Sequence, residues 1–237
     1  WFESAVDPGP EPYILLGQLY YQLERYKDAI VPVETAIRLA KESGREIKEN
    51  WWLLLRVFYY ELENYPKVIE ILEILVKEHP KKEYWVQVSH MYGEQKKEAD
   101  QLAAMETAYV QSMLEKDSEQ VNMAYLYLNG DVPYKAAKVM DKGLNNKSIE
   151  GKSKNWELTG NAWRQAQELD KAIAAMEEAA AKSDKGELYA RLCNIYLDND
   201  EFNKSITAIN KGLSRGGVKR CGCKAGDEDG DNSDSKF

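Results

Sequence analysis

Residues 155–180 read NWELTGNAWRQAQELDKAIAAMEEAA, in which large and small residues recur at helical spacing. Trp156, Gly160 and Trp163 are separated by four and then three positions, which places them on one face of a helix. Ala172 and Ala179 mark one face of a second helix in the same way. Because glycine and alanine let a partner helix come close, the stretch predicts a tightly crossed helix pair.

The same pattern recurs along the chain with a period of about 34 residues. If Trp156 is the fourth position of its repeat, the repeats start near Pro10, Glu49, Lys82, Asp117, Ser153 and Gly186. Position 11 is then aromatic every time, as Tyr20, Tyr59, Tyr92, Tyr127, Trp163 and Tyr196. Position 8 is small five times, as Gly17, Ser89, Ala124, Gly160 and Cys193. Arg56 departs from this rule, so the second repeat is irregular or its alignment is shifted by one residue.

A period near 34 with these landmarks is typical of the tetratricopeptide repeat (TPR), a helix–turn–helix unit that stacks on its neighbours. We therefore predict an all-α, right-handed helical solenoid of about six helix pairs, followed by an irregular C-terminal tail. The predicted repeats are residues 10–43, 49–81, 82–115, 117–150, 153–185 and 186–217. Residues 1–9 are expected to be the remnant of an earlier repeat, and residues 218–237 a flexible tail that contains cysteine and aspartate.

The composition argues against several classes of protein. The formal net charge is -8 and no long run of Lys or Arg occurs, so we expect no nucleic-acid partner. No apolar run reaches the roughly 18 residues that a membrane span needs. The chain lacks a phosphate-binding glycine loop and a Ser-His-Asp order, and its paired carboxylates fit an exposed helix face. The sequence therefore predicts a protein that is not an enzyme and that needs no cofactor.

The concave face of such an array is the main candidate for binding a protein or peptide, because packing of the helix pairs does not require its residues. Asn161 and Asn194 hold position 9 of adjacent repeats, 33 residues apart. Each amide offers a donor and an acceptor, which suits a peptide backbone. Arg164, together with Arg191, would add a contact to a carboxylate. The alternative is a solvated polar face that binds nothing.

Further towards the N-terminus, the corresponding positions are more aromatic. Tyr21, Tyr60 and Tyr125 would form an apolar groove for a partner segment, since tyrosine combines a large ring with a polar tip. The alternative is that these rings pack against neighbouring helix pairs. His90 falls on the same face. Its only potential metal-binding neighbour one turn away is Glu94, so we count His90 as a partner-binding candidate and predict no metal site there.

The cysteines and the acidic tail offer weaker candidates. Cys193 is expected to be a buried, inert thiol at a small-residue position, while Cys221 and Cys223 could bind a soft metal or form a redox pair. Alternating carboxylates are typical of calcium loops, and in the tail they are Asp227, Asp229, Asp231 and Asp234. The glycine and the final glutamate of an EF-hand are missing, so a solvated tail is the alternative that we favour.

Four longer segments carry a more specific resemblance. They are ENWWLLLRVFYYELENYPKVIEILEILVKEHPKKEYWVQVSHMYGE, LYLNGDVPYKAAKVMDKGL, KNWELTGNAWRQAQELDKAIAAMEEAA and SDKGELYARLCNIYLDNDEF. Together they resemble the TPR proteins found beside ExbB, ExbD and TonB components in marine gamma-proteobacteria. The resemblance runs from about Trp1 to Gly217 and includes residues that the repeat pattern does not require.

The resemblance implies a bacterial, periplasmic or envelope-associated adaptor that assists TonB-dependent energy transduction, with ExbB, ExbD or TonB components as partners. It transfers no role to any single residue. Members of that group usually have further repeats before the position of Trp1 and after Arg220, where this chain turns to CGCKAGDEDGDNSDSKF. Two alternatives stay open: a general TPR adaptor in envelope assembly or in cytoplasmic complexes, and an enzyme or metal-binding module that uses the tail.

Overall fold

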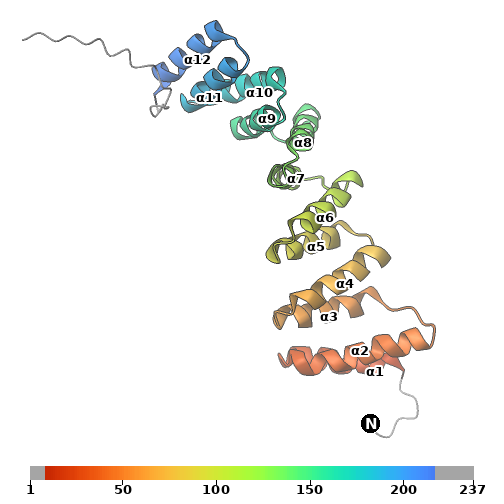
Figure 1. Ribbon diagram of the computed structural model, residues 1–237. Coiled ribbons are helices and arrows are strands. Elements are labelled where there is room, and N and C mark those ends of the chain that lie inside the picture. The colour runs from red at the N-terminus through yellow and green to blue at the C-terminus, as the bar shows by residue number, and fades with distance from the viewer. Residues whose placement is uncertain (1–8, 217–237) are drawn as a thin grey trace, which may run out of the picture. The chain divides into compact units, whose positions relative to one another are not determined.

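The computed structural model describes residues 9–216, which form twelve α-helices and no strand (Figure 1). The predicted all-α helical-repeat fold is confirmed. The helices are α1 (Pro10–Gln22), α2 (Tyr26–Glu42), α3 (Glu49–Glu61), α4 (Tyr65–Glu78), α5 (Lys82–Glu94), α6 (Glu98–Val110), α7 (Asp117–Asn129), α8 (Pro133–Asn145), α9 (Ser153–Gln165), α10 (Leu169–Ala181), α11 (Glu187–Asp198) and α12 (Phe202–Arg215).

The helices belong to two compact bodies. The N-terminal body, Trp1–Gly130, contains α1 to α7, and the C-terminal body, Asp131–Phe237, contains α8 to α12. Within each body every helix packs against the next one along the chain. Each pair can therefore bury its apolar faces only by stacking on a neighbouring pair. The first repeat is longer than the others, because α2 has 17 residues and a loop separates it from α3.

The two helices of each repeat are joined by a short turn that uses a left-handed backbone conformation. The middle residue of the turn, at position 15, has φ near +57°, for example 57° at Glu24, 56° at Glu63 and 61° at Gln167. The next amide then donates to the carbonyl at position 11, as from Asn64 to Tyr59 at 2.8 Å. This pattern is a common way for a helix to end, although glycine usually occupies the left-handed position.

Small residues let the two helices of a repeat cross closely, as predicted. A Cβ on Gly17 would lie 2.4 Å from Cγ2 of Val33, and one on Gly160 would lie 3.3 Å from the Ala172 carbonyl oxygen. Cys193 is buried, as expected, with its Sγ 3.0 Å from Oγ of Ser205 across the same kind of crossing. The small-residue rule therefore has a direct steric cause.

Arg56 is the exception at the crossing position, and it does not shift the repeat. Helices α3 and α4 keep the expected register, beginning at Glu49 and Tyr65. The half-buried guanidinium donates from Nη1 to Oε1 of Gln87 on α5, while its Nε has no hydrogen-bond partner. Burial lowers the pKa of Arg56. The irregularity therefore concerns one side chain and not the alignment.

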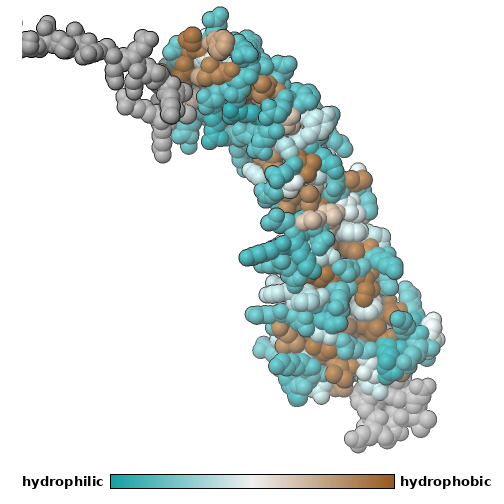
Figure 2. Space-filling view, in the orientation of Figure 1, coloured by the Kyte–Doolittle hydropathy of each residue, from teal (hydrophilic) through white to brown (hydrophobic). Residues whose placement is uncertain are grey.

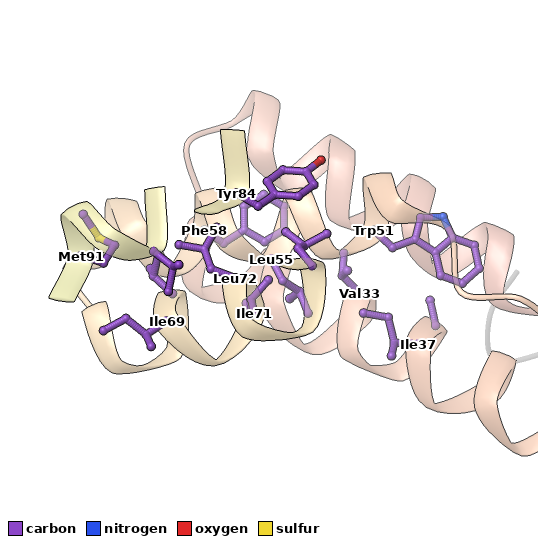
Figure 3. Close-up of a cluster of buried hydrophobic side chains, with 14 of the residues drawn as sticks. Val33, Ile37, Trp51, Leu55, Phe58, Ile69, Ile71, Leu72, Tyr84 and Met91 are labelled. Carbon is purple, nitrogen blue, oxygen red and sulfur yellow. The ribbon is translucent and has the colours of Figure 1, made fainter. Parts of the chain in front are cut away.

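The core of the N-terminal body runs continuously through successive helix pairs. Figure 3 shows side chains from consecutive helices meeting in one layer, with Phe58 and Leu72 among them. Phe58, Leu72 and Leu75 are essentially inaccessible to solvent. This continuity follows from the repeat, because the apolar stripe of each helix faces both its own partner and the next pair.

A hydrogen bond from position 11 to an acid at position 25 of the preceding repeat links each successive pair of repeats. The donors are aromatic N–H or O–H groups, and the acceptors lie on the preceding second helix. The bonds are Tyr59 to Glu34 (2.6 Å), Tyr92 to Glu73 (2.5 Å), Tyr127 to Glu106 (2.8 Å), Trp163 to Asp141 (3.1 Å) and Tyr196 to Glu177. We call this set the aromatic–acid ladder.

Several sequence-based predictions lie outside the described residues. They are the N-terminal remnant before Gly9, the CGC pair of Cys221 and Cys223, and the calcium candidates Asp227, Asp229, Asp231 and Asp234. These remain predictions.

Candidate partner-binding surfaces

The first helices of the C-terminal body present two side-chain amides that have no partner. Asn161 lies on α9 and Asn194 on α11, and both are half-buried. Neither side chain forms a hydrogen bond to any other described residue, although other amides on the same helices do, such as Asn155 to the Glu150 carbonyl. Each amide therefore keeps a free donor and a free acceptor for a ligand.

The two arginines expected to capture a carboxylate are already engaged within the body. Arg164 of α9 donates to Asp198 of α11, with Nη2 2.6 Å from Oδ2. Arg191 of α11 donates to Glu157 of α9. The pairs cross between the same two helices in opposite directions, so they link α9 to α11. A ligand carboxylate would have to compete with an internal one at either arginine.

In the N-terminal body, residues of α1 and α3 line a groove of about 270 Å³ that is open to solvent. Its lining is mainly apolar and includes Tyr21, Leu53 and Val57. The Tyr21 ring is held by the rings of Phe58 and Tyr26, at centroid distances of 5.8 and 6.0 Å. It is still 42% exposed. The Tyr21 ring therefore packs against its neighbours and also lines the groove, while partner binding there stays a prediction.

The other predicted residues of this body lie on successive first helices. Tyr60 on α3 is 52% exposed, with its ring against Tyr65, and Tyr125 on α7 is 50% exposed. The exposed His90 on α5 lies 3.8 Å from Glu94. Neither Tyr60 nor Tyr125 lines the α1–α3 groove. The predicted set is thus divided between two bodies, with Tyr21, Tyr60, His90 and Tyr125 in one and Asn161, Arg164 and Asn194 in the other.

Residues 9–216 contain neither a metal-ligand cluster nor a helix that could span a membrane. Between residues 9 and 216 no three His, Cys, Asp or Glu side chains gather closely enough to hold a metal ion. Within the same range no helix combines the length and the apolar character that crossing a membrane requires. What the surface does offer is apolar side chains in contact with solvent. Figure 2 shows hydrophobic side chains exposed over α12, where Phe202, Ile206 and Leu213 are each about 60% exposed.

Sequence reasoning missed two grooves that lie beside the second helices. The α10–α12 groove has a volume of about 410 Å³ and is lined by Glu177, Ala181, Tyr189, Leu192, Tyr196, Lys204, Thr207, Ala208 and Lys211. The α4–α6 groove, about 210 Å³, is lined by Glu73, Val76, Trp85, Val88, Tyr92, Asp100, Ala103, Ala104 and Thr107. Eight of the nine lining residues hold the same repeat positions in both grooves, and only Ala181 and Val76 differ, by one position. The recurring acid at position 25, which appears in each of the first five repeats, was the sequence signal that could have indicated this side of the molecule.

Comparisons with known proteins establish the fold alone. No family model and no curated protein matches the chain. A crystal structure of MamA is similar over 66% of this chain and 91% of its own, with 13% identity and a TM-score of 0.50. A second MamA structure (MSR-1, C2) covers 72% and 97%, with 12% identity and a TM-score of 0.51. A TPR protein from Parabacteroides merdae covers 87% and 93%, with 14% identity and a TM-score of 0.46.

Proposed function

We propose that this protein is a non-enzymatic interaction scaffold whose first helices bind a peptide segment of a partner protein. The observation that carries the proposal is the pair of free amides on Asn161 and Asn194. They occupy the same repeat position on adjacent first helices, and neither forms a hydrogen bond with another described residue. Both amides still reach solvent, so a bound peptide backbone would replace their hydrogen bonds to water with hydrogen bonds to the ligand.

The ion pairs beside these amides support the same function. Arg164–Asp198 and Arg191–Glu157 link α9 to α11 on either side of the amides, which favours one arrangement of the two side chains. A preorganised surface lowers the entropy that binding must overcome. The α1–α3 groove with Tyr21 would give the N-terminal body a separate, more apolar contact.

The experiment is a selection of peptides from a random displayed library, followed by measurement of each dissociation constant. Asn161→Ala with Asn194→Ala is the test variant. The matched control is Asn203→Ala with Asn210→Ala, because these two exposed amides lie on the second helix α12. Loss of two hydrogen bonds to a peptide backbone should weaken binding by about tenfold or more in the test variant only.

Equal weakening in both double variants, or in neither, would contradict a peptide site on α9 and α11. Circular dichroism of each variant checks that the helices are intact. Since the Asn161 and Asn194 side chains form no hydrogen bond with any residue between 9 and 216, their replacement should leave thermal stability nearly unchanged.

We further propose that the partner belongs to a TonB-type energy-transducing system of the bacterial envelope, which places the protein in the periplasm. The support is the sequence resemblance over residues 1–217. Affinity capture from detergent-solubilised envelopes, with ExbB, ExbD and TonB quantified by mass spectrometry, tests this step separately. If those components are absent while peptides still bind at Asn161 and Asn194, the TonB link fails and a general TPR adaptor, in envelope assembly or in the cytoplasm, remains.

A further inference from the structure

The α10–α12 groove and the α4–α6 groove have equivalent apolar residues at their base, which we call the floor. The charged residues at their edges, the rims, are different. In both, the floor comes from a first helix at positions 4, 7 and 11. These residues are Tyr189, Leu192 and Tyr196 in the first groove and Trp85, Val88 and Tyr92 in the second. A buried alanine of the second helix, Ala208 or Ala104, completes each floor. The two grooves are therefore the same structural feature in two different repeats.

The rims of the grooves carry different residues at matched positions. Lys204 and Lys211 line the α10–α12 groove, where Asp100 and Thr107 line the α4–α6 groove. The lining of the α4–α6 groove contains no lysine or arginine, although Lys97 lies over the Tyr92 ring nearby. One groove therefore has a cationic rim and the other an acidic one.

Two cations beside the α10–α12 groove have no carboxylate partner among the described residues. The Lys211 side chain forms no ion pair or hydrogen bond with any residue between 9 and 216. Arg215, one turn further along α12, lies 4.8 Å above the Tyr189 ring and donates only to the carbonyls of Ala180 and Ser183. Lys204 differs, because it pairs with Glu201. The free positive charge is thus concentrated at the Lys211 end of the groove.

Glu177, the one carboxylate in the lining of the α10–α12 groove, does not neutralise the Lys211 end of the groove. Glu177 accepts the hydroxyl hydrogen bond of Tyr196 as part of the aromatic–acid ladder. No ion pair joins Glu177 to Lys211. An anionic group that enters above Leu192 and Ala208 would meet Lys211 and Arg215 without displacing an internal salt bridge.

We propose that the α10–α12 groove is a second binding site, which takes a partner-protein segment with an aromatic or large aliphatic side chain beside one or more carboxylates. The apolar side chain fills the volume of about 410 Å³ above Leu192 and Ala208. The carboxylates contact Lys211 and Arg215. A small inorganic anion would satisfy the cations but leave the apolar floor exposed, whereas an acidic peptide satisfies both.

The experiment measures fluorescence anisotropy of two labelled peptides with the full-length protein. One peptide alternates Phe and Leu with Glu and Asp, and the other carries Lys in place of each acid. The first test variant is Lys211→Thr, which removes a side chain that forms no ion pair within the described part of the chain. The second is Lys204→Asp with Lys211→Thr, which gives the groove the rim residues of the α4–α6 groove. The matched gain-of-charge variant is Asp100→Lys with Thr107→Lys.

The acidic peptide should bind the natural protein about tenfold more tightly than the lysine peptide. Its affinity should fall several-fold with Lys211→Thr and about tenfold with the double variant. The gain-of-charge variant should create a second site of similar affinity. Asn161→Ala with Asn194→Ala should leave this binding unchanged, so the result does not depend on the first-helix site.

Equal binding of the two peptides, or no effect of Lys211→Thr in a folded variant, would overturn the proposal.

The chain's own acidic segment is the competing occupant. Replacing Asp227, Asp229, Asp231 and Asp234 by Asn in the full chain tests it. A several-fold gain in affinity for the acidic peptide would assign the groove to that segment and overturn the assignment to a partner protein; unchanged affinity supports the partner.

Discussion

At the scale of single residues, Gly17 shows how one missing side chain sets the distance between two helices. A Cβ at this position would lie 2.4 Å from Cγ2 of Val33, well inside van der Waals contact. Val33 is fully buried between the pairs and has little space in which to move. Because the site is closely packed, an added methyl group would force the two helices apart or force Val33 to move. Either change would lower the stability of the fold.

Gly17→Ala should therefore lower the free energy of unfolding by about 1–3 kcal/mol, despite the better helix propensity of alanine. Chemical denaturation checks this value. The control is the double variant Gly17→Ala with Val33→Ala, in which the two changes should offset each other in part, because the clashing methyl group is removed. A double variant less stable than the sum of both single changes would contradict the steric explanation.

The tyrosines of the aromatic–acid ladder make stability sensitive to alkaline pH. Burial first, and then the hydrogen bond to a carboxylate, raises the pKa of Tyr59, Tyr92, Tyr127 and Tyr196 above the ordinary value of 10.0. The same causes raise the pKa of Tyr84 to about 12, through Glu49. In the unfolded chain these phenols lose their protons earlier. The unfolded state then binds fewer protons than the folded state, so unfolding becomes more favourable as pH rises.

We expect the stabilisation by these tyrosines to be complete below pH 10. It should be lost progressively as the pH rises through the pKa values that the tyrosines have in the folded protein. Thermal melting at constant ionic strength, followed from below pH 10 to about pH 12, checks the direction. Tyr92→Phe with Tyr196→Phe should reduce the slope of melting temperature against pH in this range. An unchanged slope in that variant would show that ladder tyrosines are not the cause.

At the scale of elements, the turn inside each repeat depends on a strained residue in place of glycine. Glu63 joins α3 to α4 with φ of 56°, and equivalent residues in the other repeats have nearly the same angle. The left-handed conformation costs roughly 1–2 kcal/mol for a residue with a side chain, and most for a β-branched one. The turn persists because the two helices that it joins are held together by their buried faces.

Glu63→Val should lower the free energy of unfolding by roughly 1–2 kcal/mol, whereas Glu63→Gly should change it little. Glycine relieves strain in the folded state but adds entropy to the unfolded one. The matched control is Glu61→Val, an exposed change at the end of α3, expected to cost only about 0.5 kcal/mol. Urea denaturation gives the free energy of unfolding of the three variants. A similar loss of stability in Glu63→Val and Glu61→Val would contradict a role for backbone strain.

At the scale of the whole molecule, stability is expected to be local, because each helix packs against its neighbours along the chain within its own body. In such arrays the free energy is close to a sum of repeat and interface contributions. Leu72 in the N-terminal body and Met176 in the C-terminal body hold the same repeat position, 24, and both are fully buried. They allow one test in each body.

Leu72→Ala should cost about 2–5 kcal/mol through lost burial and a residual cavity. Hydrogen exchange followed by mass spectrometry should show faster exchange in α3 to α6 and little change in α9 to α12. Met176→Ala is the matched control, and it should accelerate exchange in α9 to α11 instead. Faster exchange throughout the chain in either variant would indicate a single cooperative unit and contradict the local description.

The repeat, the helices and the residues at which helices cross could all be read from the order of residues alone. Helical periodicity and the need for a small side chain at a crossing are local properties, so they appear directly in the order of residues, as at Gly160 and Trp163. The candidate amides Asn161 and Asn194 could be predicted for the same reason, since their spacing equals one repeat.

The pairing of polar side chains between repeats could be seen only in the folded structure. Arg164 pairs with Asp198 across 34 residues, and Tyr196 donates to Glu177 of the preceding repeat. Such partners depend on the distance between stacked helices, which no single helix encodes. The same holds for the charge of the α10–α12 groove. Lys211 and Lys204 look like ordinary surface lysines in the sequence, and only the stacking of three helices places them around one apolar floor.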